Sequence, residues 1–205
     1  MLEIIHNDST CTVAIHPILQ EEQFDSKDIA PEIHAKSKKR KCEWHTNHKV
    51  LKEILREPVT YTYDAQGKPL LNNRKEKISI SHSKNYSAVI VSSERRVGID
   101  IEELSPLIFK ISERFVNELE QKFINNHDQK TELLYIIWCA KEALYKLSEI
   151  SLDFKEHIFI KDFLLGNSGT FNAKIIHPQK NEKYVLHYRI TSEYVLVWVV
   201  EFNSL

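Results

Sequence analysis

Two carboxylates on one short segment are the residues whose types and spacing most directly suit metal chemistry. Asp100 and Glu102 lie two residues apart in Val97–Glu102 (VGIDIE), where β-branched residues predict a strand. Alternate side chains of a strand share a face, so both carboxylates should project from one side while Ile99 and Ile101 point into the core. Carboxylates about 7 Å apart suit a hard divalent cation. Taken alone, the pair also fits a half-buried strand with a solvated acidic face.

A helical segment further along the chain carries a second group of polar side chains. At 100° per residue, its apolar stripe comprises Leu133, Ile137, Ala140, Leu144 and Leu147. The opposite side carries Trp138, Glu142, Tyr145 and Lys146. A carboxylate and an ammonium flanked by aromatic rings indicate the wall of a cleft. Glu142 and Lys146 are also spaced as an ordinary helix ion pair, which is worth about 0.2–0.5 kcal/mol.

A cluster of hydroxyl and imidazole groups ends the predicted strand Ile78–Ser81. Alternation places Ile78 and Ile80 inward and Ser79 and Ser81 outward, with His82 next. Such a cluster can donate hydrogen bonds to phosphate oxygens. A serine nucleophile with its base is a poorer interpretation, because Ser81 and His82 should point to opposite faces and no G-x-S-x-G is present. A polar surface turn remains the alternative.

A basic run precedes these segments. Lys36–Lys41 contains five cations in six residues, which is either a solvated helix face or an electropositive entrance for a multiply charged phosphate ligand. His45 and His48 follow at a spacing that can bind a metal, but no third His or Cys stands at ligand spacing.

The composition excludes several classes of protein. In 205 residues, 28 Lys and Arg balance 29 Asp and Glu, without the basic excess typical of nucleic-acid binders. The four glycines form neither GxGxxG nor GxxxxGK[ST], although Gly98 would allow a close approach to its strand. Three scattered cysteines favour a reducing cytoplasm over a disulfide scaffold. We expect neither a signal peptide, because Glu3 and Asp8 interrupt the start, nor a membrane span.

Helices and strands occur in separate runs, which indicates an α+β fold rather than alternating βαβ units. Periodicity predicts helices at about 34–56, 108–125 and 130–149. Strands are expected at 2–6, 11–15, 59–63, 78–81, 87–91, 97–102, 158–165, 169–177, 184–190 and 194–202. A loop with a short helix is expected at 19–34, a turn at 64–67, and a Pro-containing loop between the strands ending at 177 and beginning at 184.

The order and spacing of these segments resemble one family. Gly67–Leu70 (GKPL), Ile78–Ser83 (ISISHS), Gly98–Glu102 (GIDIE) and Trp138–Lys146 (WCAKEALYK) succeed one another as in the 4′-phosphopantetheinyl transferases of the larger, surfactin-synthetase-activating type. The resemblance extends from about residue 36 to 150. The GIDIE segment followed by WxxKEAxxK is its most specific part.

This resemblance implies a fold of two similar α/β halves, related by a pseudo-two-fold axis, with antiparallel sheets and packed helices. Residues 1–95 would form the coenzyme A nucleotide-binding half. Residues 96–205 would carry the metal and catalytic residues, and the halves would form one compact unit.

The resemblance also implies the site residues. Asp100, Glu102 and Glu142 match the family's magnesium ligands, with Mn2+ as a possible substitute, and Glu142 is also the candidate base. Lys146 matches the lysine that contacts the pyrophosphate. The nucleotide contacts implied are Lys39, Arg40, Lys68, Ser81 and His82. The family often carries an arginine where His48 stands, so His48 would make phosphate binding weaker or sensitive to pH.

The reaction implied by the resemblance moves the 4′-phosphopantetheine arm of coenzyme A to a serine of an apo acyl or peptidyl carrier protein, and releases adenosine 3′,5′-bisphosphate. We expect a cytoplasmic monomer that serves fatty-acid, polyketide or nonribosomal-peptide synthesis, with neither nucleic acid nor membrane as a partner. Carrier contacts are expected at about 104–123, where Phe109, Phe115 and Arg114 are candidates, although core packing would also explain the two phenylalanines.

Two other functions remain open at this point. A metal-dependent phosphodiesterase could use the same carboxylates with water as its nucleophile, and it would break down coenzyme A without a carrier. A non-catalytic module that binds coenzyme A or a carrier would show binding without turnover.

Overall fold

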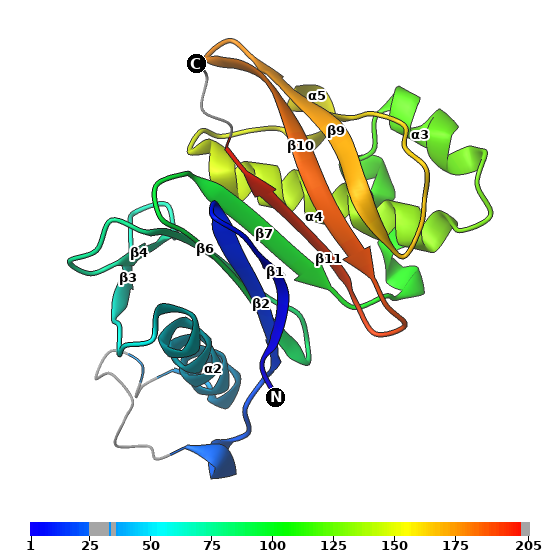
Figure 1. Cartoon of the computed structure of the whole chain (residues 1–205). Helices are drawn as coiled ribbons and strands as arrows, with labels where there is room; N and C mark the ends of the chain where they lie inside the picture. The colour runs from blue at the N-terminus through cyan, green and yellow to red at the C-terminus, as the bar shows by residue number, and fades with distance from the viewer. Residues whose placement is uncertain (25–32, 34–35, 202–205) are drawn as a thin grey trace. The chain divides into compact units, whose positions relative to one another are not determined.

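The chain folds into two units, which are described separately. A computed structural model describes residues 1–24, 33 and 36–201 (Figure 1). Its units are Met1–Glu94 and Arg95–Leu205. Each unit contains an antiparallel sheet, in agreement with the expected α+β class. Most of the loop expected at 19–34 lies outside the described residues, but its short helix is present as the 3-10 turn η1 (Glu21–Gln23).

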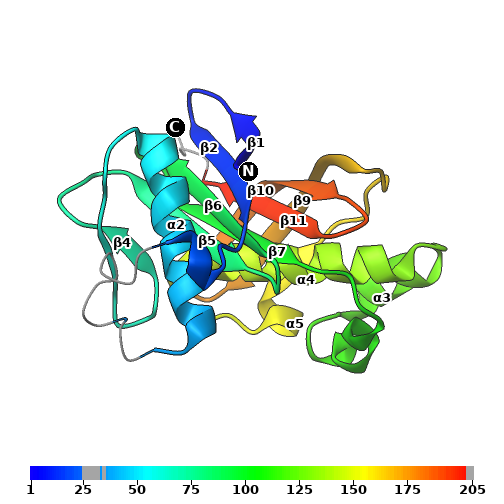
Figure 2. The same cartoon turned by 90° about the horizontal axis from the view of Figure 1, so that it is seen from below.

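The N-terminal unit is built on a four-stranded antiparallel sheet in the order β1-β2-β6-β5. One long helix packs on it, as Figure 2 shows. Val50 and Leu51 of that helix pack with Ala14, Ile78 and Val89 of the sheet. The elements are β1 (Glu3–Asn7), β2 (Cys11–Pro17), α2 (Lys38–Leu55), β5 (Lys77–His82) and β6 (Tyr86–Ser92).

Local sequence signals explain the bounds of α2. The Ser37 side chain accepts a hydrogen bond from the Arg40 backbone and caps the first turn. At the other end, Arg56 adopts the left-handed conformation, and Pro58 follows, which cannot continue a helix. The helix therefore confirms the predicted segment with a later start.

A small hairpin follows α2. Its strands are β3 (Tyr61–Tyr63) and β4 (Pro69–Leu71), and the second of these was not expected. Asp64 accepts hydrogen bonds from the backbone of Gln66 and Lys68, while Gly67 supplies the positive φ of 81° that the turn requires. The turn at 64–67 is confirmed.

The C-terminal unit combines a five-stranded antiparallel sheet, in the order β7-β11-β10-β9-β8, with a long helix. Figures 1 and 2 show this helix, α4, along β7 and β11. The core cluster joins α4 to Val195, Val197 and Val199 of β11. The main elements are β7 (Val97–Glu102), α4 (Lys130–Ser148), β8 (Ile158–Ile160), β9 (Ser168–His177), β10 (Lys180–Ile190) and β11 (Val195–Val200).

The helix predicted over 108–125 is wrong in most of its length. The segment forms two short 3-10 helices, η3 (Pro106–Lys110) and η4 (Ser112–Arg114), before the α-helix α3 (Glu118–Asn125). Asn117 starts α3 by accepting hydrogen bonds from two backbone N–H groups, and the Glu120 side chain accepts one from the Asn117 backbone N–H. This capping box outweighs the weak helical periodicity before it.

Two other boundaries need correction. The strand expected at 158–165 is shorter, since β8 ends at Ile160. The short helix α5 (Phe154–His157), capped by Asp153, directly precedes β8. The Pro178 segment is not a loop up to residue 184. Strand β10 already begins at Lys180, which pairs with His177 across a tight turn.

A buried ion pair fixes α3 to α4. Lys141 is fully buried and its Nζ lies 2.7 Å from Glu120 Oε2, while it also donates to the carbonyls of Phe115 and Phe154. The other Glu120 oxygen accepts from the Ile160 backbone. Burial lowers the pKa of Lys141 and Glu120 opposes that shift. The pair therefore joins five segments of the unit: α3, α4, β8, the helix before β8 and the residues before α3.

We expect Lys141→Met to lower the free energy of unfolding by about 3–5 kcal/mol, because it leaves Glu120 buried without its counterion. Urea unfolding measures this, with Lys122→Met on the exposed face of α3 as the control. The double variant Lys141→Met/Glu120→Gln should recover part of the loss. A single variant as stable as the wild type would contradict the structural role.

Among the helices within the described part of the chain, none has the length and apolar character needed to cross a membrane.

Candidate functional site

The close packing of β7 on α4 positions the first group of candidate residues. A Cβ added to Gly98 would lie 1.9 Å from the carbonyl oxygen of Ala143 on α4, so the two backbones nearly touch. Asp100 and Glu102 share the Gly98 face of β7 and therefore lie on the side covered by the helix. Asp100 is only 4% exposed. The solvated acidic face is thus wrong, and a helix covers the carboxylates instead.

The isoleucines of β7 are buried in the core, as predicted, but not on the side of the strand that meets α4. Ile99 and Ile101 are fully buried, but neither belongs to the core cluster between the sheet and α4. They lie on the face of β7 opposite Gly98 and Asp100. Both faces of this strand are therefore buried, and its alternating pattern identifies its two faces without saying which one meets the helix.

The polar side of α4 was predicted correctly. Between Leu133 and Ser148, the residues that are not fully buried are Trp138, Glu142, Tyr145 and Lys146. Lys146 Nζ donates to Asp100 Oδ1 at 2.8 Å and to the Ile99 carbonyl at 3.0 Å. Its ion pair thus reaches across to β7 rather than along the helix, and it joins the two motifs that lie far apart in the sequence.

Burial and mutual repulsion disfavour negative charge on the remaining carboxylates. Burial, followed by the charge of Asp100, raises the pKa of Glu102 to about 7. The same two causes raise the pKa of Glu142, and the Lys146 ammonium opposes both shifts. Trp138 Nε1 donates to Glu102 Oε1 at 3.2 Å, which orients that carboxylate.

These carboxylates fit a magnesium ion by the chemistry of their donors. Asp100, Glu102 and Glu142 offer only oxygen, which Mg2+ prefers, and an added cation would relieve the repulsion that raises two of their pKa values. Their oxygens do not form a group of three that all lie within 4.8 Å of one another. Mg2+ does not require such a cage, because it keeps several waters and commonly binds one or two carboxylates plus phosphate oxygens.

The raised pKa of Glu102 predicts a pH dependence for the metal-free protein. Its carboxyl group keeps a proton up to about pH 7 when folded but only to 4.5 when unfolded. The folded state then binds more protons between these values, so its stability falls as pH rises through them. Urea unfolding at about pH 5 and about pH 8 should show a smaller decrease for Glu102→Gln than for the wild type. Added Mg2+ should reduce the wild-type decrease, and equal decreases in both proteins would contradict this assignment.

The second group of candidates lies on α2 and β5 of the N-terminal unit. His82 Nε2 is 2.9 Å from Asn47 Oδ1, so the imidazole points toward α2. Ser81 lies on the opposite face of β5 from His82, as expected from strand alternation. Both Ser79 and Ser81, however, are buried rather than directed to solvent. Lys68 lies in the hairpin turn, where its backbone is held by Asp64.

The basic run is partly neutralised. Lys39 Nζ lies 3.7 Å and Arg40 Nη1 3.2 Å from the carboxylate of Glu43, which is buried on the same helix. Lys38 pairs with Glu21. The Arg40 guanidinium also lies over the ring of Tyr63 at 5.6 Å. Glu43 therefore orients both predicted phosphate contacts, a role that the sequence pattern did not indicate.

The two histidines of α2 belong to an aromatic stack. His48 lies between Trp44 and Tyr61, with ring centroids 3.7 and 4.7 Å away, and its Nδ1 is 2.9 Å from the Trp44 carbonyl. His45 stacks on Phe24 at 3.7 Å. Their separate partners favour packing over shared metal ligation, in line with the missing third ligand.

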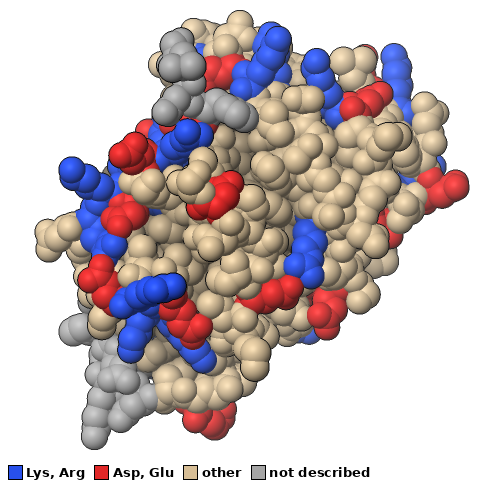
Figure 3. Space-filling view, viewed as in Figure 1, with Lys and Arg blue, Asp and Glu red and all other residues tan. Residues whose placement is uncertain are grey.

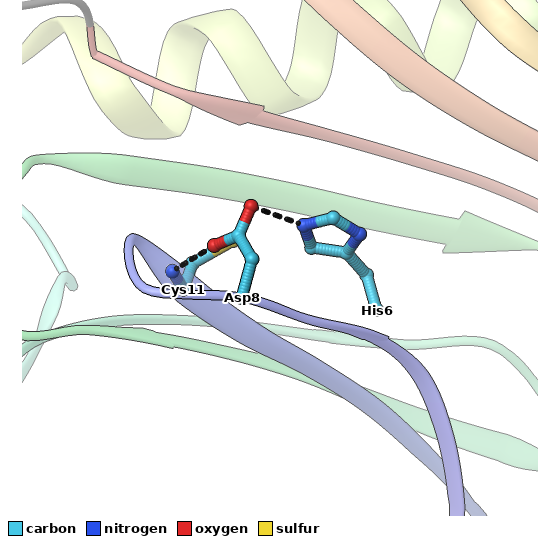
Figure 4. A group of neighbouring side chains, drawn as sticks. All are labelled: His6, Asp8 and Cys11. Atoms are coloured by element: carbon cyan, nitrogen blue, oxygen red, sulfur yellow. Dashed lines mark hydrogen bonds and ion pairs between the residues drawn. The ribbon is translucent and has the colours of Figure 1, made fainter.

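A further group of metal-ligating types lies at the β1–β2 turn. The ligand atoms of His6, Asp8 and Cys11 all lie within 4.8 Å of one another (Figure 4). Asp8 Oδ1 accepts three hydrogen bonds, from the backbone and hydroxyl of Thr10 and from the Cys11 backbone, and Oδ2 lies 2.9 Å from His6 Nε2. These bonds hold the pKa of Asp8 well below its usual range. The hydrogen bonds of the Asp8 carboxylate thus stabilise the turn, and we assign His6, Asp8 and Cys11 a structural role.

A cavity in the N-terminal unit is lined by residues other than the candidate site residues. It has a volume of about 740 Å3 and is lined by residues 57–60, 72–76 and Ser93. Arg74, its lining arginine, is paired with Glu57 and Glu76. None of the predicted site residues lines it.

Charges of both signs are interspersed on the face shown in Figure 3. This view agrees with the near balance of 28 basic and 29 acidic residues in the sequence.

Comparison with known proteins identifies the family. The model of the 4′-phosphopantetheinyl transferase superfamily matches residues 96–199, which contain both β7 and α4. This match covers just over half of the chain, so the chain belongs to that superfamily. The membership agrees with the resemblance that the GIDIE and WCAKEALYK segments indicate.

Three relatives carry names from the same family. The Synechocystis protein slr0495 is 32% identical over 101 residues, or 46% of this chain and 41% of that protein. HetI of Nostoc is 30% identical over 96 residues, 43% of this chain and 40% of HetI. Gsp of Aneurinibacillus migulanus is 30% identical over 137 residues, 66% of this chain and 54% of Gsp. The chain thus spans about two fifths to one half of the length of these relatives.

Proposed function

We propose that this chain transfers the 4′-phosphopantetheine arm of coenzyme A to a serine hydroxyl of an apo acyl or peptidyl carrier protein. The observation that supports this function best is the arrangement of Asp100 and Glu102 on β7 beneath the polar face of α4. There, Lys146 contacts Asp100, and the negative charge of Asp100 helps to raise the pKa of Glu142. Family membership supports the same reaction, because the matched residues contain this arrangement.

In the proposed reaction, the serine oxygen attacks the phosphorus attached to the pantetheine arm. The P–O bond to the nucleotide breaks and adenosine 3′,5′-bisphosphate leaves. Glu142 accepts the serine proton, directly or through water, and a carboxylate with a raised pKa is suited to hold it. A bound Mg2+ would neutralise the pyrophosphate, with Asp100, Glu102 and Glu142 as its protein ligands. No protein nucleophile is needed.

Lys146 supplies positive charge to this site. Its ammonium group compensates the negative charge of Asp100 and donates a hydrogen bond to the Ile99 carbonyl of the same strand. These two contacts orient the ammonium group. In the proposed complex, the Lys146 ammonium also contacts the pyrophosphate. It stabilises the negative charge that develops as the bond to the nucleotide breaks.

The N-terminal unit contributes the nucleotide contacts in this proposal, through Lys39, Arg40, Lys68, Ser81 and His82. Glu43 limits the free charge of Lys39 and Arg40, so both cations must exchange part of their ion pair for a phosphate. Asn47 lies within hydrogen-bond distance of one ring nitrogen of His82 and thereby orients its imidazole.

The segment after β7 supplies the proposed carrier contacts. Phe109 and Leu107 of η3 are 47% and 61% exposed, and Arg114 is exposed nearby. Phe115 is not available as a contact, because it is 1% exposed and packs edge-on against Trp138. Carrier helices with acidic side chains would match Arg114. We further propose a cytoplasmic monomer, with Mg2+ as the usual metal and Mn2+ as a substitute, which binds neither nucleic acid nor a membrane.

Mass spectrometry of the carrier tests this function directly. The protein is incubated with coenzyme A, Mg2+ and several apo carriers from fatty-acid, polyketide and peptide synthesis. A mass gain of one phosphopantetheine arm is expected on at least one carrier, and none should occur with EDTA or with a carrier whose serine is replaced by alanine. Coenzyme A breakdown without carrier would favour a phosphodiesterase. Binding of coenzyme A without either reaction would favour a non-catalytic module.

A further inference from the structure

A buried asparagine on α2 connects the candidate phosphate ligand His82 to the core of its unit. Asn47 is 1% exposed. Its Nδ2 donates to the Tyr61 hydroxyl at 3.0 Å, and its Oδ1 accepts from the Ser87 hydroxyl at 2.8 Å and lies 2.9 Å from His82 Nε2. One carboxamide thus joins the helix to β3, β5 and β6.

The polarity of this position needs an explanation, because its neighbours are apolar. Val50 and Leu51, one turn along α2, are fully buried in the same core. Burying a carboxamide costs free energy unless hydrogen bonds compensate for lost water. The three bonds of Asn47 offset that cost, and the side chain that gains a fixed orientation from them is the imidazole of His82.

The direction of these bonds sets the protonation of the ring. Asn47 Oδ1 is an acceptor, so His82 Nε2 must carry the hydrogen. In the neutral imidazole, Nδ1 is then an acceptor, which a phosphate oxygen would repel. His82 can donate from Nδ1 only as the doubly protonated imidazolium.

We propose that Asn47 is a positioning residue that fixes the tautomer of His82 and thereby couples coenzyme A binding to the uptake of one proton. This inference rests on the proposed function, which places His82 at the nucleotide phosphates. Asn47 itself does not touch the ligand.

Several of the groups that the described residues place around this pair are neutral or already paired. On β3, burial holds the pKa of Tyr61 far above its usual range, so its hydroxyl is neutral. On β6 the contact is the uncharged Ser87. On α2, His48 stacks against Tyr61, Arg40 lies over Tyr63, and the Glu43 carboxylate is already paired with Arg40 and Lys39.

The experiment measures coenzyme A affinity by isothermal titration calorimetry from about pH 6 to about pH 9, in buffers with different ionisation heats. For the wild type, Kd should rise about tenfold per pH unit above the pKa of free His82, and about one proton should be taken up there. In Asn47→Asp, the new carboxylate stabilises the imidazolium, so the rise in Kd should begin at higher pH. Asn47→Leu should weaken binding with little change in kcat at saturating coenzyme A. Asn172→Asp, at an exposed position of β9, is the matched control.

A second measurement needs no ligand. Nitrogen-15 chemical shifts of the His82 ring in the free protein should report a hydrogen on Nε2 in the wild type and a mixture of tautomers in Asn47→Leu. The hydrogen on Nδ1 in the wild type, or the same pH profile of Kd in Asn47→Asp, would overturn the inference. Binding with the predicted proton uptake but no transfer to any carrier would refute the proposed function and leave the role of Asn47 standing. No binding of coenzyme A would refute both.

Discussion

Glu142→Gln is expected to lower kcat for transfer about 10^2- to 10^4-fold, the usual contribution of a general base. The change removes the proton acceptor and one proposed metal ligand but keeps the size of the side chain. Burial and Asp100 already raise the pKa of Glu142, so the folded protein disfavours its charge. A neutral amide should therefore not destabilise the fold, and the melting temperature should stay the same or rise.

The measurement combines single-turnover transfer with thermal unfolding at the same pH. Glu132→Gln, in the first turn of the same helix, controls for the loss of one negative charge from α4. Coenzyme A affinity in the absence of metal should be nearly unchanged in both variants. Full transfer by Glu142→Gln would remove this residue from the mechanism, even if the proposed reaction itself is correct.

Sequence patterns predicted which residues of α4 reach a polar site, because helical periodicity depends only on the rotation per residue. Trp138, Glu142, Tyr145 and Lys146 are the less buried positions, as that rotation requires. The pattern could not give the ion pair of Lys146. That pair depends on the distance between α4 and β7, which is set by Gly98 and by packing of segments far apart in the chain.

Buried polar residues were the main failure of the sequence analysis. Lys141 was assigned no role, although it is fully buried and organises the segment after β7. Asn47 and Glu43 were likewise passed over, since helical periodicity cannot distinguish a polar residue in solvent from one that is satisfied inside the core. Tertiary partners decide between these cases. An Asn, Glu or Lys at an inward position of a predicted helix is the available signal.

The same limit explains the serines of β5. Alternation correctly separated Ser79 and Ser81 from Ile78, but it implied that one face was solvated. Both serines are buried, so both faces of the strand are covered. Small hydroxyl side chains fit such a position because their single polar group can be satisfied locally, and polarity alone is a poor guide to exposure for them.

Gly98→Ala is the substitution with the largest expected effect on the whole C-terminal unit. The added Cβ would lie 1.9 Å from the Ala143 oxygen and 2.8 Å from its carbonyl carbon, and both are backbone atoms that no side-chain rotation can move. Strand β7 and helix α4 must then separate. We expect the free energy of unfolding to fall by about 3 kcal/mol or more, at the upper end of overpacking effects.

Activity should fall more than stability in Gly98→Ala, because the substitution separates the elements that carry the two halves of the carboxylate group. Asp100 is on β7 and Glu142 on α4, and a shift of about 1 Å between catalytic groups can cost about 10^2-fold in rate. Urea unfolding and transfer assays on the folded fraction measure both effects. Gly166→Ala is the control, since its added Cβ has no neighbour closer than 3.7 Å. If Gly98→Ala retained wild-type stability and kcat, the close contact of β7 with α4 would not be what positions the carboxylates.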